Sequence, residues 1–120
     1  MGKQVMVVDD DEDVREILGD YLTLKGYAVS MAENGQQALD ILEGLPEKPC
    51  FLLLDLMMPV MDGWQFLRQI EPDNDLSSIP VFVTTSAPER APKGYPLLPK
   101  PVDLHQVARA VQSVCNDSTD

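Results

Sequence analysis

Residues 51–59 read FLLLDLMMP, in which four apolar residues run unbroken into one carboxylate, Asp55. A second run of this kind, VMVV at residues 5–8, leads straight into three aspartates at residues 9–11. Continuous apolar runs of this length are typical of strands that are buried on both faces of a parallel sheet. In such sheets, ligands bind in the crevice outside the carboxyl ends of the strands. We therefore expect three or more carboxylates in one crevice, a concentration of charge that indicates a divalent cation.

Strands and helices alternate along the rest of the chain. The expected strands are residues 4–9, 27–31, 50–55, 80–85 and, as a minimal fifth strand, 97–98. The expected helices are residues 13–25, 36–44, 64–70 and a final helix that begins after Asp103. This alternation predicts a doubly wound α/β fold, in which a five-stranded parallel sheet is covered on both faces. A chain of 120 residues suits one domain, and we expect residues 1–120 to form a single one.

Caps and turns punctuate this pattern. Asp11 and Asp103 each precede a helical stretch, so we expect both to be helix N-caps. Residues 59–63, PVMDG, are expected to form a turn in which Gly63 adopts a positive φ angle. Residues 86–99 contain four prolines and a glycine, so we expect an irregular segment there in place of a helix.

The charge and the cysteines limit the classes of function. With 20 acidic and 9 basic residues, the formal net charge is −11, which argues against nucleic acid or an anionic membrane as a direct partner. No apolar stretch approaches the roughly 20 residues that span a bilayer, and the first strand begins too early to leave room for a signal peptide. Cys50 and Cys115 stand far apart on expected apolar faces. We therefore expect both to be reduced core residues of a cytoplasmic protein.

Five motifs in order resemble those of the receiver domain of two-component response regulators. They are the acidic pair Asp9-Asp10, Asp55 with the loop that follows it, the Met61-Asp62-Gly63 turn, Thr85 five residues after Pro80, and Lys100-Pro101. The resemblance covers essentially the whole chain. It implies a flavodoxin-like fold and a role as a phosphoprotein in phosphorelay signal transduction.

The resemblance also implies a role for each site residue. Asp55 is expected to be the phospho-acceptor, and Lys100 and Thr85 to contact the phosphoryl oxygens. A Mg²⁺ ion is expected on Asp9, Asp10, Asp55 and the backbone carbonyl of Met57, because this ion prefers hard oxygen ligands. Thr84 is the neighbouring alternative to Thr85, and only the spacing from Pro80 favours Thr85. Such a protein is not an enzyme in the usual sense, since it catalyses only its own phosphorylation and dephosphorylation.

Three departures from the family concern how the site signals its state. Residues 86–99 are too short to hold the usual fourth helix, so the face that this helix normally helps to form is altered. Leu97 stands where the family commonly has an aromatic residue, with Tyr95 as a candidate substitute. Met57 and Ala87 occupy the positions that influence the access of water to the acyl phosphate. Because apolar side chains cannot orient an attacking water, we expect slow self-dephosphorylation.

The expected phosphoryl donor is a histidine kinase or a histidine phosphotransfer protein, and the downstream protein is unknown. We expect a stand-alone receiver, because no output domain follows the last helix. We expect it to be a monomer or a phosphorylation-dependent dimer. Two alternatives remain from the residues. One is a receiver-like interaction module that no longer switches, which the shortened segment 86–99 favours. The other is a Mg²⁺-dependent phosphohydrolase, which would need a second carboxylate where the chain has Met57.

Overall fold

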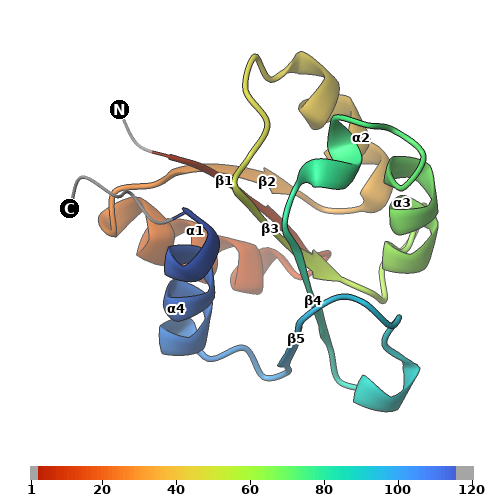
Figure 1. The fold of residues 1–120 in the computed structure, drawn as a ribbon. Helices are drawn as coiled ribbons and strands as arrows, with labels where there is room; N and C mark the ends of the chain where they lie inside the picture. The colour runs from red at the N-terminus through yellow and green to blue at the C-terminus, as the bar shows by residue number, and fades with distance from the viewer. Residues whose placement is uncertain (1–2, 116–120) are drawn as a thin grey trace.

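The computed structural model describes residues 3–115, which form a five-stranded parallel sheet with helices on both faces (Figure 1). The strands are β1 (Gln4–Val8), β2 (Ala28–Ala32), β3 (Phe51–Asp55), β4 (Val81–Thr85) and β5 (Leu97–Pro99). The helices are α1 (Glu12–Leu24), α2 (Gly35–Gly44), α3 (Gly63–Ile70) and α4 (Leu104–Cys115), with short 3-10 turns η1 (Leu76–Ser78) and η2 (Pro88–Arg90). The predicted doubly wound α/β fold is confirmed.

The strand order creates a crevice at one edge of the sheet. The order is β2-β1-β3-β4-β5, so the chain returns past β1 to β3 after it has formed β2. In a doubly wound sheet, the crevice at such a reversal lies outside the carboxyl ends of the two strands. Asp9 directly follows β1, and Asp55 is the last residue of β3. The fold therefore places both carboxylates at this crevice.

Strand β3 is buried along its whole length, which explains its unbroken apolar sequence. Phe51 and Leu53 pack in the core layer of α1 and α4, whereas Leu52 and Leu54 pack in the layer of α2 and α3. Figure 1 shows these two pairs of helices on opposite faces of the sheet. Full burial of each such side chain contributes about 1.5–3 kcal/mol, so β3 anchors both layers. In the described part of the chain, no helix has the length and apolar character needed to cross a membrane.

Aspartate side chains begin three of the helices. The Asp11 side chain accepts hydrogen bonds from the amides of Asp13 and Val14, and Asp103 does the same for the first turn of α4. Asp62 forms a capping box with Gln65 at the start of α3. The predicted N-cap roles of Asp11 and Asp103 are confirmed. The Asp11 carboxylate is thereby occupied at the helix and is not part of the acidic cluster described below.

The prediction of a positive φ angle at Gly63 is wrong, because the positive-φ glycines are Gly26 and Gly94. Gly63 is instead required for space. A β carbon at Gly63 would lie only 2.8 Å from the Asp55 carbonyl oxygen and from the Leu56 α carbon. The start of α3 therefore packs directly on the backbone at the end of β3. In the turn itself the left-handed residue is Val60, with a φ angle of 67°.

The prediction that both cysteines are reduced is also wrong, since Cys50 and Cys115 form a disulfide with an α-carbon separation of 5.4 Å. Their expected location is right, because Cys115 is buried in the core layer of α1 and α4 and Cys50 packs against it. The two residues are 65 positions apart in the sequence, so only the docking of α4 beside the start of β3 brings them together. The two cysteines therefore give no support for a cytoplasmic location.

The segment between β4 and β5 contains no α-helix, as its prolines predict. Two contacts attach it to α3. The Tyr95 hydroxyl lies 2.8 Å from a Glu71 carboxylate oxygen, and the Arg90 guanidinium lies 5.3 Å from the centre of the Trp64 ring. Tyr95 and Leu97 also pack against the core layer of α2 and α3. The segment is thus irregular but tied to the body of the domain.

Candidate functional site

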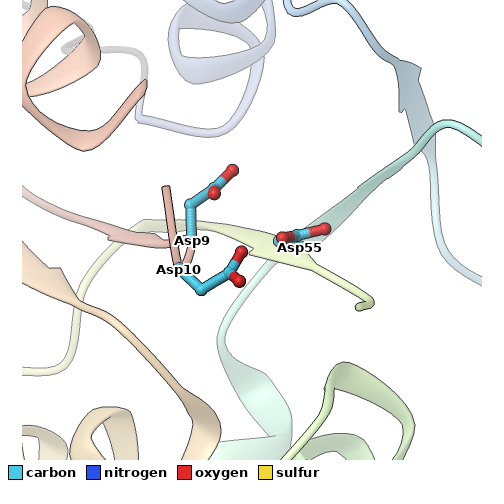
Figure 2. A group of neighbouring side chains, drawn as sticks. All are labelled: Asp9, Asp10 and Asp55. Carbon is cyan, nitrogen blue, oxygen red and sulfur yellow. The ribbon is translucent and has the colours of Figure 1, made fainter. Parts of the chain in front are cut away.

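Three aspartates converge at the carboxyl ends of β1 and β3 (Figure 2). One carboxylate oxygen from each of Asp9, Asp10 and Asp55 lies within 4.8 Å of the others. Asp9 and Asp55 are only 2% and 1% exposed, whereas Asp10 faces solvent. Two buried carboxylates and one at the surface form a cluster that is open on one side. The sequence-predicted acidic crevice is therefore present in the fold.

Backbone hydrogen bonds hold Asp9 in place. Its amide donates to the Ala32 carbonyl at 3.0 Å, which ties the end of β1 to β2. Its side chain accepts from the Asp11 amide at 2.9 Å, and its carbonyl accepts from the Arg15 guanidinium at 2.7 Å. No sequence pattern marks Arg15 for this role, because the first turn of α1 comes back over the strand end only in three dimensions. The Asp9 carboxylate is therefore held in place by the backbone of the protein itself.

Lys100 links Asp55 to Asp9. Its ammonium nitrogen lies 3.3 Å from Asp55 Oδ1 and 3.7 Å from Asp9 Oδ2. The Lys100 amide donates to the Thr85 carbonyl at 3.2 Å, and the peptide bond to Pro101 is cis. Lys100 follows β5, two strands away from β3, so only the sheet brings this cation to the two carboxylates. Its predicted position in the crevice is where the structure places it.

The two oxygens of Asp55 have different environments. Oδ1 accepts from the Met57 amide at 3.3 Å and contacts Lys100. Oδ2 is buried and has no hydrogen-bond partner among the described residues. An unsatisfied buried carboxylate oxygen is costly, so this atom is a ready acceptor for a metal ion or an electrophile.

Burial and charge raise the pKa values in this cluster. Burial raises the pKa of Asp55 to about 6, with a further increase from the Asp9 carboxylate and an opposing effect of Lys100. Burial likewise raises the pKa of Asp9. For Lys100, burial lowers the pKa, but the Asp55 and Asp9 carboxylates outweigh it and the net pKa is raised. Lys100 thus stays charged, and the two buried carboxylates keep a proton to a higher pH than an exposed aspartate does.

The threonines at the end of β4 differ in their hydrogen bonds. Thr85 Oγ1 accepts from the Ala87 amide at 3.0 Å, so its hydroxyl proton remains free to donate. Thr84 is directly opposite Asp55 in the ladder, and its hydroxyl is fully buried without a partner among the described residues. Neither hydroxyl has a hydrogen bond to Asp55 in this part of the chain. Both threonines lie beside the acidic crevice, on the strand next to β3.

The loop after β3 faces Asp10 across a shallow pocket of about 310 Å³. Its walls are formed by Asp10, Met57, Met58, Pro59 and Asp62. The Met57 side chain is 52% exposed, and its amide is directed to Asp55. Of the three clustered aspartates, only Asp10 lines this pocket.

The sequence model described as "response regulator receiver domain" matches residues 5–112. The chain belongs to this family. Among curated relatives, it is 32% identical to the response regulator MprA of Mycolicibacterium vanbaalenii over 126 aligned residues, which cover 99% of the chain. The same alignment covers 53% of that relative, so this receiver spans about half the length of MprA.

Solved receiver domains have the same fold. The receiver domain of the hybrid histidine kinase CckA is 29% identical and has a TM-score of 0.78, with 92% of the present chain and 96% of that chain covered. The receiver domain of the sensor histidine kinase PA1611 from Pseudomonas aeruginosa PAO1 has a TM-score of 0.85, with 98% and 100% covered. At 22% identity, the second comparison supports the fold alone. That structure is described as having a magnesium ion coordinated in the active-site cleft.

Proposed function

We propose that this receiver accepts a phosphoryl group on Asp55 in a reaction assisted by Mg²⁺ and signals its state through protein contacts. One observation carries the proposal. Asp55 presents a buried oxygen, Oδ2, that has no hydrogen-bond partner among residues 3–115, while its other oxygen lies 3.3 Å from the Lys100 ammonium. A carboxylate with one oxygen free and a fixed cation at the other is suited to attack a phosphoryl group and to stabilise the product.

The residues of the cluster fit a Mg²⁺ ion. One oxygen from each of Asp9, Asp10 and Asp55 lies within 4.8 Å of the others, and these three carboxylates supply hard oxygen donors of the kind that Mg²⁺ prefers. Asp9, Asp10, Asp55 and the backbone carbonyl of Met57 would hold the ion. When bound, the ion neutralises charge on the transferring phosphoryl group. The magnesium ion described for the PA1611 receiver supports this assignment.

The chain's own residues would carry out the transfer. A carboxylate oxygen of Asp55 attacks phosphorus, the P–O bond forms, and the P–N bond of the donor phosphohistidine breaks to release imidazole. Lys100 stabilises negative charge on the phosphoryl oxygens, and the free Thr85 hydroxyl proton is available to another of them. Asp55 must be ionised to attack, and with a pKa of about 6 it is mainly ionised at neutral pH. We propose Thr85 rather than Thr84 for this role.

The phosphoryl donor would be a histidine kinase or a histidine phosphotransfer protein. Family membership supports this class of donor, as does the occurrence of similar receivers within the histidine kinases PA1611 and CckA. Met57 follows Asp55 by two residues and Ala87 follows Thr85 by two, and neither apolar side chain has a group that could activate water. We therefore propose that the acyl phosphate is long-lived, with a half-life of minutes or more.

Intact-mass spectrometry with Mg²⁺ and a small phosphoryl donor, acetyl phosphate or phosphoramidate, tests the proposal. We expect a gain of one phosphoryl group that depends on Mg²⁺ and disappears in Asp55→Asn. Asp20→Asn removes an exposed carboxylate from α1 and is the matched control, which should react like the wild type. Labelling of Asp55→Asn at the wild-type rate would refute the assignment. Absence of any adduct would favour a module that no longer switches, and steady hydrolysis of phosphate esters would favour a phosphohydrolase.

A further inference from the structure

The disulfide of Cys50 and Cys115 lies at the end of the sheet opposite the aspartate cluster. Cys50 directly precedes β3, whereas Asp55 is the last residue of the same strand. Cys115 is the last residue of α4. The bond therefore joins the strand that carries the acceptor aspartate to the C-terminal helix, without contact to the acidic crevice.

The last turn of α4 has few other attachments. Its buried face consists of Val107, Ala110, Val111 and Cys115, so within Leu104–Cys115 the only buried residue after Val111 is Cys115. The last turn carries no basic side chain that would interact favourably with the helix dipole. Without the covalent bond, the end of α4 would be held mainly by the packing of one small thiol. Helix ends with so few contacts open readily.

We propose that Cys50 and Cys115 form a reversible thiol–disulfide site that clamps the last turn of α4 when oxidised and releases it when reduced. The co-reactant is a dithiol reductant. One of its thiolates attacks a sulfur of the pair and forms a mixed disulfide, and the other cysteine leaves as a thiolate and takes up a proton. The second thiol of the reductant then resolves the mixed disulfide. Two electrons pass to the cysteines, and the reductant leaves as its own disulfide.

Burial determines which sulfur is attacked. Cys115 is only 4% exposed in the core layer of α1 and α4, whereas Cys50 is half-buried at the start of β3. A thiolate reaches Cys50 more easily, so the mixed disulfide forms there and Cys115 is the leaving group. Once released, the Cys115 thiol behaves as a small apolar side chain. The reduced domain is then expected to stay folded, with a looser end of α4.

Two measurements on the full chain test the clamp. In glutathione buffers of graded ratio, alkylation followed by intact-mass spectrometry gives the oxidised fraction, which we expect to change from mostly reduced to mostly oxidised across the series. Hydrogen exchange of peptides from α4 should be at least ten-fold faster in the reduced form near Cys115, with β1 and β3 unchanged. If the disulfide stays intact throughout the glutathione series, it is a permanent structural link. If hydrogen exchange near Cys115 is equal in the oxidised and reduced forms, the disulfide does not clamp the last turn of α4. Either result would overturn the proposal.

Single-cysteine variants test the direction of attack. Cys115→Ser leaves Cys50 as the free thiol, and Cys50→Ser leaves Cys115. We expect N-ethylmaleimide to modify Cys50 at least ten-fold faster than Cys115. Equal rates, or faster modification of Cys115, would contradict the assigned order of attack. Wild-type protein that has been reduced but not mutated provides the same comparison if a variant folds poorly.

Discussion

At the residue scale, Asp55, the proposed phospho-acceptor, lowers the stability of the fold at neutral pH. Burial, and then the neighbouring Asp9 carboxylate, raise its pKa to about 6. The folded chain therefore holds the Asp55 proton more tightly than the unfolded chain, in which the pKa is about 4. The stability that this proton provides is fully present below about pH 4 and is lost as the pH rises through about 6. At neutral pH, the ionised carboxylate opposes folding unless a cation is bound.

Replacing this carboxylate should consequently stabilise the metal-free protein at neutral pH. We expect Asp55→Asn to raise the free energy of unfolding by about 1–2 kcal/mol at about pH 7 in the presence of a chelator. The difference should vanish near pH 4, where Asp55 is protonated. Urea denaturation across this pH range measures it, with Asp10→Asn as a control that removes an exposed carboxylate and should have a smaller effect. If Asp55→Asn were less stable than the wild type at about pH 7, burial and repulsion by Asp9 would not be the main effects of the Asp55 carboxylate on the free energy of unfolding.

Val60 is a second residue whose conformation costs stability. Its φ angle of 67° lies in the left-handed region, which is unfavourable for a β-branched side chain, and its side chain is 80% exposed. Val60→Asn should stabilise the domain by about 1 kcal/mol, because asparagine tolerates this conformation. Val60→Ala keeps the β carbon and should gain less. Thermal or urea denaturation compares the two variants, and an equal gain would exclude backbone strain as the cause.

At the element scale, the unusual part is the irregular segment between β4 and β5. It follows Thr85 directly and ends before Lys100, so it connects two residues of the proposed site. The Tyr95 hydroxyl donates to Glu71, and the pKa of Tyr95 is raised to about 12, first by burial and then by this hydrogen bond. Because the segment contains no α-helix, contacts of this kind hold it against α3.

Removing this hydrogen bond should loosen the segment without disturbing the acidic cluster. We expect Tyr95→Phe to lower the free energy of unfolding by about 1 kcal/mol and to speed hydrogen exchange in residues 86–96. Tyr27→Phe is the control, because no hydrogen bond of its hydroxyl occurs in the described residues. Hydrogen exchange in residues 86–96 at the wild-type rate would show that the Arg90–Trp64 contact and core packing are sufficient to hold the segment against α3. Trp64 fluorescence provides a second measurement, since its ring contacts this segment.

At the scale of the whole molecule, local sequence patterns predicted most of the architecture. The buried run at residues 51–54 has the pattern of a strand covered on both faces, and the caps at Asp11 and Asp103 lie within a few residues of the amides that they accept from. The acidic crevice was predictable for the same reason, because carboxylates at parallel strand ends meet at one edge. The reason for a glycine at position 63 is not predictable in this way, since the space it leaves is needed by the backbone of another element.

Periodicity, caps and motif spacing along the chain are sufficient to predict the order of strands and helices, the layers of the fold and the family. Which distant groups meet is known only from the three-dimensional fold. The fold brings Lys100 to 3.3 Å from Asp55, leaves Asp55 Oδ2 without a hydrogen-bond partner among the described residues, and joins Cys50 to Cys115 across 65 residues. Contacts between remote segments depend on how helices dock on the sheet. No local pattern in the chain records that docking.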